Sequence, residues 1–138
     1  MTISQGVIKW LETFKPEEYW EMKGISTDVQ PAKVNSYSLV KEPIVNKRTS
    51  ITGTVRATAH YTLMARLDSQ MDAERVDNNT WGELLEEWVA EKNKKKELPE
   101  IEGVTVQSVA VTTPFYLGES EANESVYQLT ISITYVKE

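Results

Sequence analysis

The chain has 138 residues, 40% of them hydrophobic and 26% charged, with a net charge of −6 and no cysteine. This length favours a single domain, residues 1–138, with room for a sizeable core. The acidic balance argues against a protein that holds nucleic acid by its phosphates, and the absence of cysteine excludes disulfides and thiolate metal sites. The N-terminus shows no signal-peptide pattern and no stretch approaches a membrane span. We therefore expect a protein of the cytoplasm, or of a particle assembled there.

The N-terminal quarter predicts two helices. From a cap at Ser4, apolar residues recur at helical spacing, which indicates an amphipathic helix packed on the core rather than on a membrane or a partner: Ile3, Val7, Trp10, Leu11 and Phe14. Proline and glycine punctuation then marks Lys15–Gly24 as a short second helix. Its Tyr19 and Trp20 serve either as core plugs or as interface anchors, and the sequence leaves both readings open.

The longest regular pattern lies at Val55–Leu67. Its residues alternate between two faces, one of them wholly apolar, which is typical of a half-buried strand of roughly 40 Å that needs partners along its whole length. Upstream, Ile25–Val29 is a short strand candidate. Ser36–Val45 is another, and Pro43 makes it an edge strand or a kinked one. The polar stretch Asn46–Thr54 ends in a threonine-glycine pair and predicts a hairpin turn into the long strand.

The strongest helix signal follows a predicted loop at Asp68–Asn79. A cap at Thr80 or at Asp77 precedes residues that share one apolar face: Trp81, Leu84, Leu85, Trp88 and Val89. The helix ends before Leu98-Pro99. Four lysines near its end indicate a solvated helix terminus rather than a nucleic-acid patch, because four glutamates precede them.

Two further strands complete the predicted fold. Val104–Val111 changes its alternation near Gln107-Ser108, which indicates a bulge. Val126–Val136 alternates cleanly, and its length makes it the best neighbour for the long strand. Between them, Pro114–Glu124 is predicted to be a loop that exposes Phe115, Tyr116 and Leu117. The order of elements favours an α+β domain, with a mostly antiparallel sheet, a long β-hairpin and amphipathic helices packed on one face. Its predicted core anchors are Trp10, Tyr61, Trp81, Leu85, Trp88, Leu129 and Ile131.

No group of residues suggests catalysis. His60, the only histidine, lies mid-strand among arginine and threonine, without a nucleophile or an orienting acid beside it. The glutamates Glu83, Glu86, Glu87 and Glu91 run around an exposed helix face, a pattern typical of solvation rather than metal binding. Phosphate-loop, dinucleotide and nucleophile-elbow motifs are absent. We therefore expect no enzyme activity, no metal and no cofactor.

Several segments, in order, carry a family resemblance. They are the Ser38–Val45 strand with its proline, the Thr52–Thr54 turn before the long strand, NNTWGELLEEWV at Asn78–Val89, LPEI at Leu98–Ile101, and a final strand ending in ITYVKE. From residue 36 onward the chain resembles the minor capsid, or tail terminator, proteins of tailed phages, of prophages of Gram-positive hosts and of phage-tail-like particles. The helix predicted at Lys15–Gly24 departs from that family.

The resemblance implies a structural subunit of a hexameric ring at the end of a tail tube, which stops tube growth and joins tail to head. Its partners would be copies of itself, the tail tube protein, and sheath or head-neck proteins. DNA would pass through without specific binding, and no membrane would be involved. The assembly surface would comprise Asn46, Lys47, Arg48, Thr49, Arg56, Thr58, His60 and Arg66. Two alternatives remain: a tail tube protein that forms stacked rings, and a monomeric binding domain with a ligand cleft lined by the Tyr19/Trp20 and Phe115/Tyr116 pairs.

Overall fold

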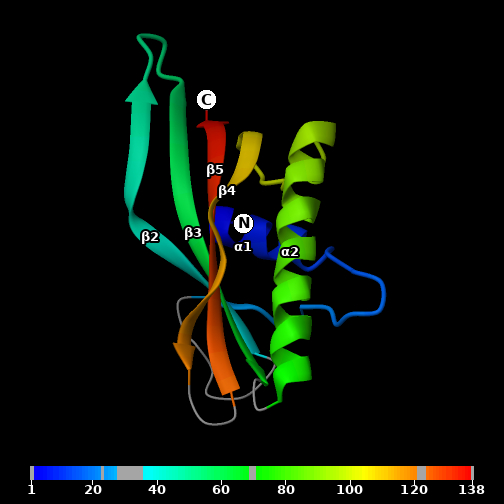
Figure 1. Ribbon diagram of the computed structural model, residues 1–138. Helices are drawn as coiled ribbons and strands as arrows, with labels where there is room; N and C mark the ends of the chain where they lie inside the picture. Colours follow the sequence, from blue (N-terminus) through cyan, green and yellow to red (C-terminus); the bar gives the residue numbers. More distant parts are fainter. Residues whose placement is uncertain (1, 23, 28–35, 69–70, 121–123, 138) are drawn as a thin grey trace.

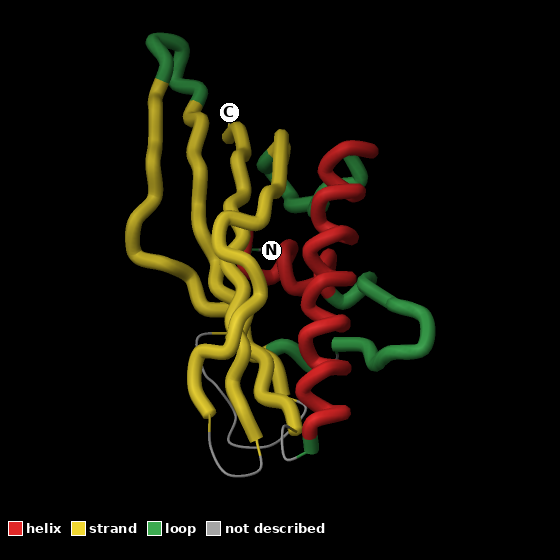
Figure 2. The backbone as a smooth tube through the Cα atoms, in the orientation of Figure 1, coloured by secondary structure: helices red, strands yellow, loops and turns green. Residues whose placement is uncertain are grey.

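The computed structural model describes residues 2–22, 24–27, 36–68, 71–120 and 124–137, which form one five-stranded sheet with two helices on one of its faces (Figure 1). The strand order is β1-β2-β3-β5-β4, and every neighbouring pair is antiparallel except β1 and β2. In chain order the elements are α1 (Ile3–Leu11), β1 (Ser26–Thr27), β2 (Ser36–Thr49), β3 (Val55–Asp68), α2 (Asp72–Lys95), β4 (Thr105–Ser120) and β5 (Glu124–Lys137). Figure 2 shows both helices beside the sheet. The predicted α+β class is confirmed.

The central strand β3 has the alternation that its sequence predicts. One face is buried in the core and comprises Ala57, Ala59, Tyr61, Leu63, Ala65 and Leu67. The other face is half-buried or exposed. Every residue of β3 pairs with β5, from Val55 opposite Lys137 to Asp68 opposite Glu124, while β2 pairs along its other side. Both predicted neighbours of this strand are therefore confirmed.

β2 is longer than predicted, since it continues past Val45 to Thr49. The polar composition of Asn46–Thr49 predicts a loop, but β3 offers these residues backbone partners. The register of the ladder shifts between Lys41 and Val45, and Pro43 lies inside that shift. Proline has no N–H to give a ladder, and the two-residue β1 does not reach this point. Of the two alternatives predicted for this strand, the kinked one is confirmed by the register shift at Pro43, whereas β1 lies outside β2 in the sheet order.

The cap of α1 is Thr2, so the prediction of Ser4 is wrong. The Thr2 hydroxyl accepts a hydrogen bond from the Gln5 N–H at 3.1 Å, and the Gln5 side chain accepts one from the Thr2 N–H at 2.8 Å. This reciprocal capping box satisfies two backbone groups at once, which explains why the helix begins before Ser4. The helix ends at Leu11, so Phe14 enters the core from the segment that follows it.

The helix predicted at Lys15–Gly24 is wrong, because the described residues of this segment form turns and bends. Glu18 has φ of 66°, a left-handed value that the interior of a right-handed helix does not contain. Packing explains the departure. The Trp20 ring stacks on Trp81 at 5.6 Å, and this contact outweighs the local helix signals.

The strand predicted at Ile25–Val29 is described only as far as Thr27. Ile25 is buried, and the two residues of β1 then pair in parallel with Ser38 and Leu39 of β2. Residues 28 and 29 lie outside the described residues.

α2 begins at Asp72, so the predicted loop over residues 72–79 and the predicted caps at Thr80 and Asp77 are wrong. The Glu74 side chain accepts a hydrogen bond from the Met71 N–H at 2.9 Å and so caps the helix start. Thr80 lies inside the helix and donates its hydroxyl to a backbone carbonyl one turn back at 3.0 Å. The first two turns lack the apolar repeat that reveals a helix in sequence. Neither described helix is long and apolar enough to cross a membrane.

β4 confirms the predicted bulge, because its register against β5 shifts between Val106 and Ser108. The loop predicted at Pro114–Glu124 is wrong up to Ser120, and residues 121–123 lie outside the described residues. β4 is the edge strand at this side of the sheet, where proline is tolerated. Further register shifts on both sides of Pro114 let the strand continue past it.

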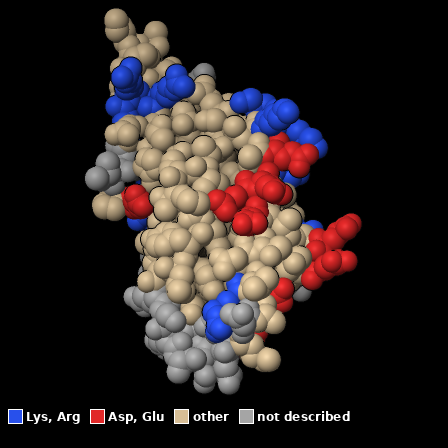
Figure 3. Space-filling model, viewed as in Figure 1, with Lys and Arg blue, Asp and Glu red and all other residues tan. Residues whose placement is uncertain are grey.

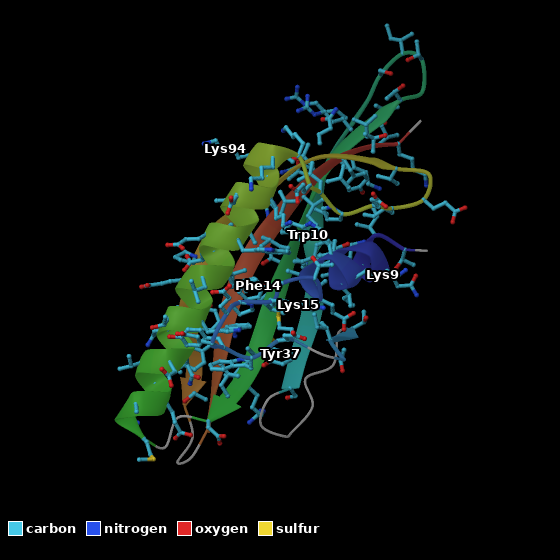
Figure 4. All side chains as sticks on the ribbon, turned by 90° about the vertical axis from the view of Figure 1, so that its right-hand side faces the viewer. Lys9, Trp10, Phe14, Lys15, Tyr37 and Lys94 are labelled. Atoms are coloured by element: carbon cyan, nitrogen blue, oxygen red, sulfur yellow. The ribbon has the colours of Figure 1, made fainter. Side chains whose placement is uncertain are left out.

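The core lies between the sheet and the helices and contains all seven predicted anchors. Buried there are Trp10, Tyr61, Trp81, Leu85, Leu129 and Ile131, while Trp88 is half-buried and packs against them. In Figure 4, Trp10 and Phe14 lie between α1 and α2. Their rings are 4.6 Å and 5.4 Å from the ring of Trp88, and the Trp10 indole N–H donates to the Glu97 carbonyl at 2.9 Å. These contacts join α1 and the segment after it to Trp88 in α2 and to Glu97 just beyond the end of that helix.

A glycine in α2 tests this packing. An added Cβ at Gly82 would overlap the Phe115 ring, which stacks on Tyr127 at 5.0 Å and meets Trp81 at 5.7 Å. Gly82→Ala therefore lowers the free energy of unfolding by about 1–3 kcal/mol, although alanine favours a helix by about 1 kcal/mol. Urea unfolding followed by circular dichroism measures the change. In a Phe115→Leu background the same substitution costs less, and an equal cost in both backgrounds would contradict the packing described.

Candidate assembly surface

The β2–β3 hairpin ends in a short, well-bonded turn, residues 50–54. Within it the Ser50 N–H donates to the Thr54 carbonyl at 2.8 Å, the Gly53 N–H donates to the Ser50 carbonyl at 3.0 Å, and the Thr54 N–H donates to the Ser50 hydroxyl at 3.1 Å. Gly53 has φ of 91°, which only glycine adopts without strain. The backbone of residues 50–54 is thereby held in a defined shape, and the predicted turn is confirmed. Figure 1 shows this turn projecting beyond the rest of the sheet.

Ile51 lies at the tip of the turn and is fully exposed, at 107%. Its neighbours on both sides hydrogen-bond to one another, Ser50 to Thr52 at 2.9 Å, while the isoleucine side chain has no contact with the core. Sequence reasoning missed this residue. The signal that could have revealed it is the presence of one large apolar residue, Ile51, in a predicted turn that is otherwise polar. At the tip of a projecting turn, such a side chain cannot be buried within its own subunit.

The structure brings most of the predicted assembly residues together near this turn. Asn46, Lys47, Arg48 and Thr49 are exposed on β2, and Arg56 is exposed on β3. Five of the predicted residues, with Thr134 of β5, line a hollow of about 500 Å³: Asn46, Lys47, Arg48, Arg56 and Thr58. The hollow opens on the sheet face that the helices leave uncovered.

Two predicted residues lie elsewhere on β3. Arg66 is at the opposite end of the strand, half-buried and paired across the sheet with Ser36 and Val126. His60 is in the middle, opposite Ser132. In the part of the chain that the structure describes, no carboxylate or nucleophile hydrogen-bonds to its ring. The structure therefore separates Arg66 from the surface around the hairpin and leaves His60 at its margin.

Like charges face one another on this surface. Arg48 and Arg56 are directly opposite across the β2–β3 ladder. Among the residues that the structure describes, no acid forms an ion pair with either of them. Figure 3 shows lysine and arginine gathered around the hairpin, while aspartate and glutamate gather along α2. Directly opposed like charges destabilise a strand pair, so the fold itself gains nothing from this arrangement.

The uncovered sheet face continues from the hairpin as a neutral ladder. Thr58 and Thr134 share a hydrogen bond at 3.1 Å, and Thr62 and Thr130 share one at 3.2 Å. The Thr62 hydroxyl also contacts the Glu42 carboxylate at 3.2 Å. Hydroxyl pairs across strands satisfy one another, so beside Glu42 this part of the face presents neutral threonine pairs. These threonine pairs suit a face that packs against another surface, or along which another molecule slides, better than one that binds a charged ligand.

The aromatic pairs proposed as a ligand cleft lie instead around one buried ring. Trp20 stacks on Trp81 at 5.6 Å, and Phe115 meets Trp81 edge-on at 5.7 Å. Tyr19 packs on Trp20 at 6.0 Å. Tyr116 points the other way, to the uncovered face, where its hydroxyl contacts the Gln128 side chain at 2.7 Å. Trp20 therefore packs against the core, as one of its two predicted roles requires. The Tyr19/Trp20 and Phe115/Tyr116 pairs do not line a common cleft.

No protein-family model matches the chain, and a search of curated proteins finds no significant match. Among the residues that the structure describes, no three histidine, aspartate or glutamate side chains are grouped so as to hold a metal ion.

Tyr37, beside Trp81 at 6.0 Å, gives a pH test of this cluster. Burial raises the pKa of Tyr37 to about 12, and the nearby Trp20 side chain lowers it only in part. The contact is a weak one, because neither the Trp20 indole N–H nor the Tyr37 hydroxyl has a partner at full hydrogen-bond geometry in the described residues. In the unfolded chain the hydroxyl ionises near pH 10.

Between about pH 10 and 12 the unfolded chain therefore releases a proton that the folded chain keeps, so the free energy of unfolding falls as pH rises through this window. Below about pH 10, Tyr37 is neutral in both the folded and the unfolded chain, so it adds nothing to the pH dependence of the free energy of unfolding. Urea unfolding across this range should show a shallower decline for Tyr37→Phe than for the parent chain. Equal slopes for the parent chain and Tyr37→Phe would contradict the buried, neutral Tyr37.

Proposed function

We propose that this chain is a structural subunit of a phage tail or phage-tail-like particle, and that copies of it close into a ring at the end of the tail tube. The family resemblance makes the ring hexameric and gives it the task of ending tube growth and joining tail to head or neck. The observation that carries the proposal is the β2–β3 hairpin, which presents a fully exposed Ile51 at the tip of a rigid turn.

The hairpin has the properties of a contact element. A large apolar side chain at a rigid tip gains free energy only when a partner covers it, and such side chains are common anchors of protein interfaces. The cationic residues below the tip, Lys47, Arg48 and Arg56, are exposed as well. An apolar anchor with charged neighbours suits a specific contact with another subunit or with the tube.

Ring closure requires contacts between different surfaces of neighbouring copies. The hairpin lies at one end of the sheet, whereas α2 covers one face of it (Figure 1), so this subunit offers distinct surfaces to two neighbours. The partners under this proposal are further copies of the chain, the tail tube protein, and sheath or head-neck proteins. DNA passes through the ring without specific binding, as a net charge of −6 favours. The ring belongs to the particle, assembled in the host cytoplasm.

A tail tube protein that forms stacked rings is a close variant of this proposal, and the same hairpin supports it equally. The monomeric binding domain has weaker support, since the aromatic pairs on which it rests surround Trp81 or face opposite sides of the sheet.

Native mass spectrometry and negative-stain microscopy of the purified chain test the proposal. Rings alone or at the ends of tail tubes support it, and stacked rings support the tube variant. A strict monomer at every concentration, with no binding to tubes, would refute both.

Ile51→Ser tests the hairpin within that framework. We expect it to weaken ring formation or tube binding about tenfold or more, as loss of an interface anchor does, with an unchanged urea midpoint because Ile51 contacts no core residue. Val76→Ser is the matched control, because Val76 is 60% exposed on α2, far along the chain from the hairpin. If both variants weaken association equally, exposed apolar area alone and not the hairpin tip is what matters, and if neither does, the contact at the hairpin tip is wrong.

A further inference from the structure

Two exposed patches of opposite sign each contain like charges that repel one another. The first is the basic patch, Arg48 and Arg56, directly opposed across the hairpin ladder. The second is the acidic patch, Glu83 and Glu87, one helical turn apart on α2, where like charges destabilise a helix. In the described parts of the chain, no ion pair relieves either patch, whereas nearby Glu91 is paired with Lys95 at 2.9 Å.

The charges of the acidic patch act on its neighbour Glu86, although burial and a hydrogen bond affect that residue more strongly. Glu86 lies between its two members, and its pKa is raised, first by burial and then by the charges of Glu83 and Glu87, against a lowering hydrogen bond from the Phe115 backbone. The patch members themselves are exposed and free to meet a partner.

The two patches face opposite directions, so they cannot meet within one chain. Arg56 precedes the buried Ala57 in β3 and therefore lies on the sheet face away from the helices. On α2, the buried Trp81, Leu85 and Val89 face the sheet, so Glu83 and Glu87 point away from it. A contact between the patches must join two copies head to tail. Each added copy then leaves one patch of each sign free, until the chain of copies closes on itself.

We propose that Arg48 and Arg56 of one copy bind Glu83 and Glu87 on α2 of the next copy. This pairing rests on the proposed ring and names the surfaces that form it. Guanidinium groups bind carboxylates through paired hydrogen bonds, and the hollow of about 500 Å³ beside the arginines also offers the hydroxyls of Thr58 and Thr134. A second copy fits this patch better than nucleic acid does, because the complementary carboxylates are on the same chain and the net charge of −6 repels phosphates.

Charge reversal tests the pairing. One variant carries Arg48→Glu and Arg56→Glu, a second carries Glu83→Arg and Glu87→Arg, and a third carries all four changes. Each two-residue variant is expected to weaken self-association about tenfold or more, and the four-residue variant to recover most of that loss, because the swapped charges again attract. Analytical ultracentrifugation at low and high salt measures association, and the wild-type association should weaken with salt. A matched control, Lys9→Glu with Lys15→Glu, changes two exposed charges on α1 and the segment after it and should leave association unchanged.

The remaining outcomes separate this pairing from the ring itself. Circular dichroism and urea midpoints first establish that each variant folds. If the two-residue variants form rings as the wild type does, or if the four-residue variant does not recover, the pairing is wrong and the ring proposal stands. If the wild type is a strict monomer that binds no tubes, the pairing and the ring proposal are both wrong. If reversal of the arginines leaves association intact but abolishes retention of double-stranded DNA, the basic patch binds nucleic acid and the pairing is again wrong.

Discussion

The pairing of β3 with β5 is the constraint on which the rest of the structure depends. Because every residue of β3 has a partner in β5, a slip of one position would move the whole buried face of β3 into water and its polar face into the core. That register also decides which side of the sheet the helices cover. Trp81 then fixes the helices to this side, since its ring contacts aromatic rings from the segment after α1, from β2 and from β4. Fixed in this way along its length, the sheet holds the hairpin turn well away from the core.

Much of this fold could be read from residue periodicity. The alternation in β3 and β5 is strict, and the apolar face from Trp81 to Val89 repeats at helical spacing, so all of these elements were predictable. The errors occurred where long-range contacts decide the structure. Residues 72–79 are helical without an apolar repeat, Pro114 interrupts a pattern but not the strand, and Trp20 is drawn from a locally plausible helix onto Trp81. None of these contacts has a signature within a short window of sequence.

The candidate surface was predictable in composition but not in geometry. A polar hairpin with Lys47, Arg48 and Arg56 is visible in the sequence, whereas the direct opposition of Arg48 and Arg56 depends on a register that a bulge at Pro43 resets. The exposure of Ile51 depends on how far the turn projects, which the pattern alone does not give. Likewise, the sequence marks Glu83 and Glu87 only as solvated residues. Their proposed role as a partner for the arginines emerges only when the structure shows that the two groups face opposite directions.

The position of β5 in the sheet has a consequence for synthesis. β5 lies between β3 and β4, yet among the described strands it is the last to leave the ribosome. Until then β4 lacks its only sheet neighbour and the inner side of β3 is unpaired, so the nascent chain can form the β2–β3 hairpin and the helices but not the core. Completion of the domain therefore waits for β5 and joins segments far apart in sequence, which slows folding. During this interval the exposed strand edges are open to a chaperone, or to another nascent copy.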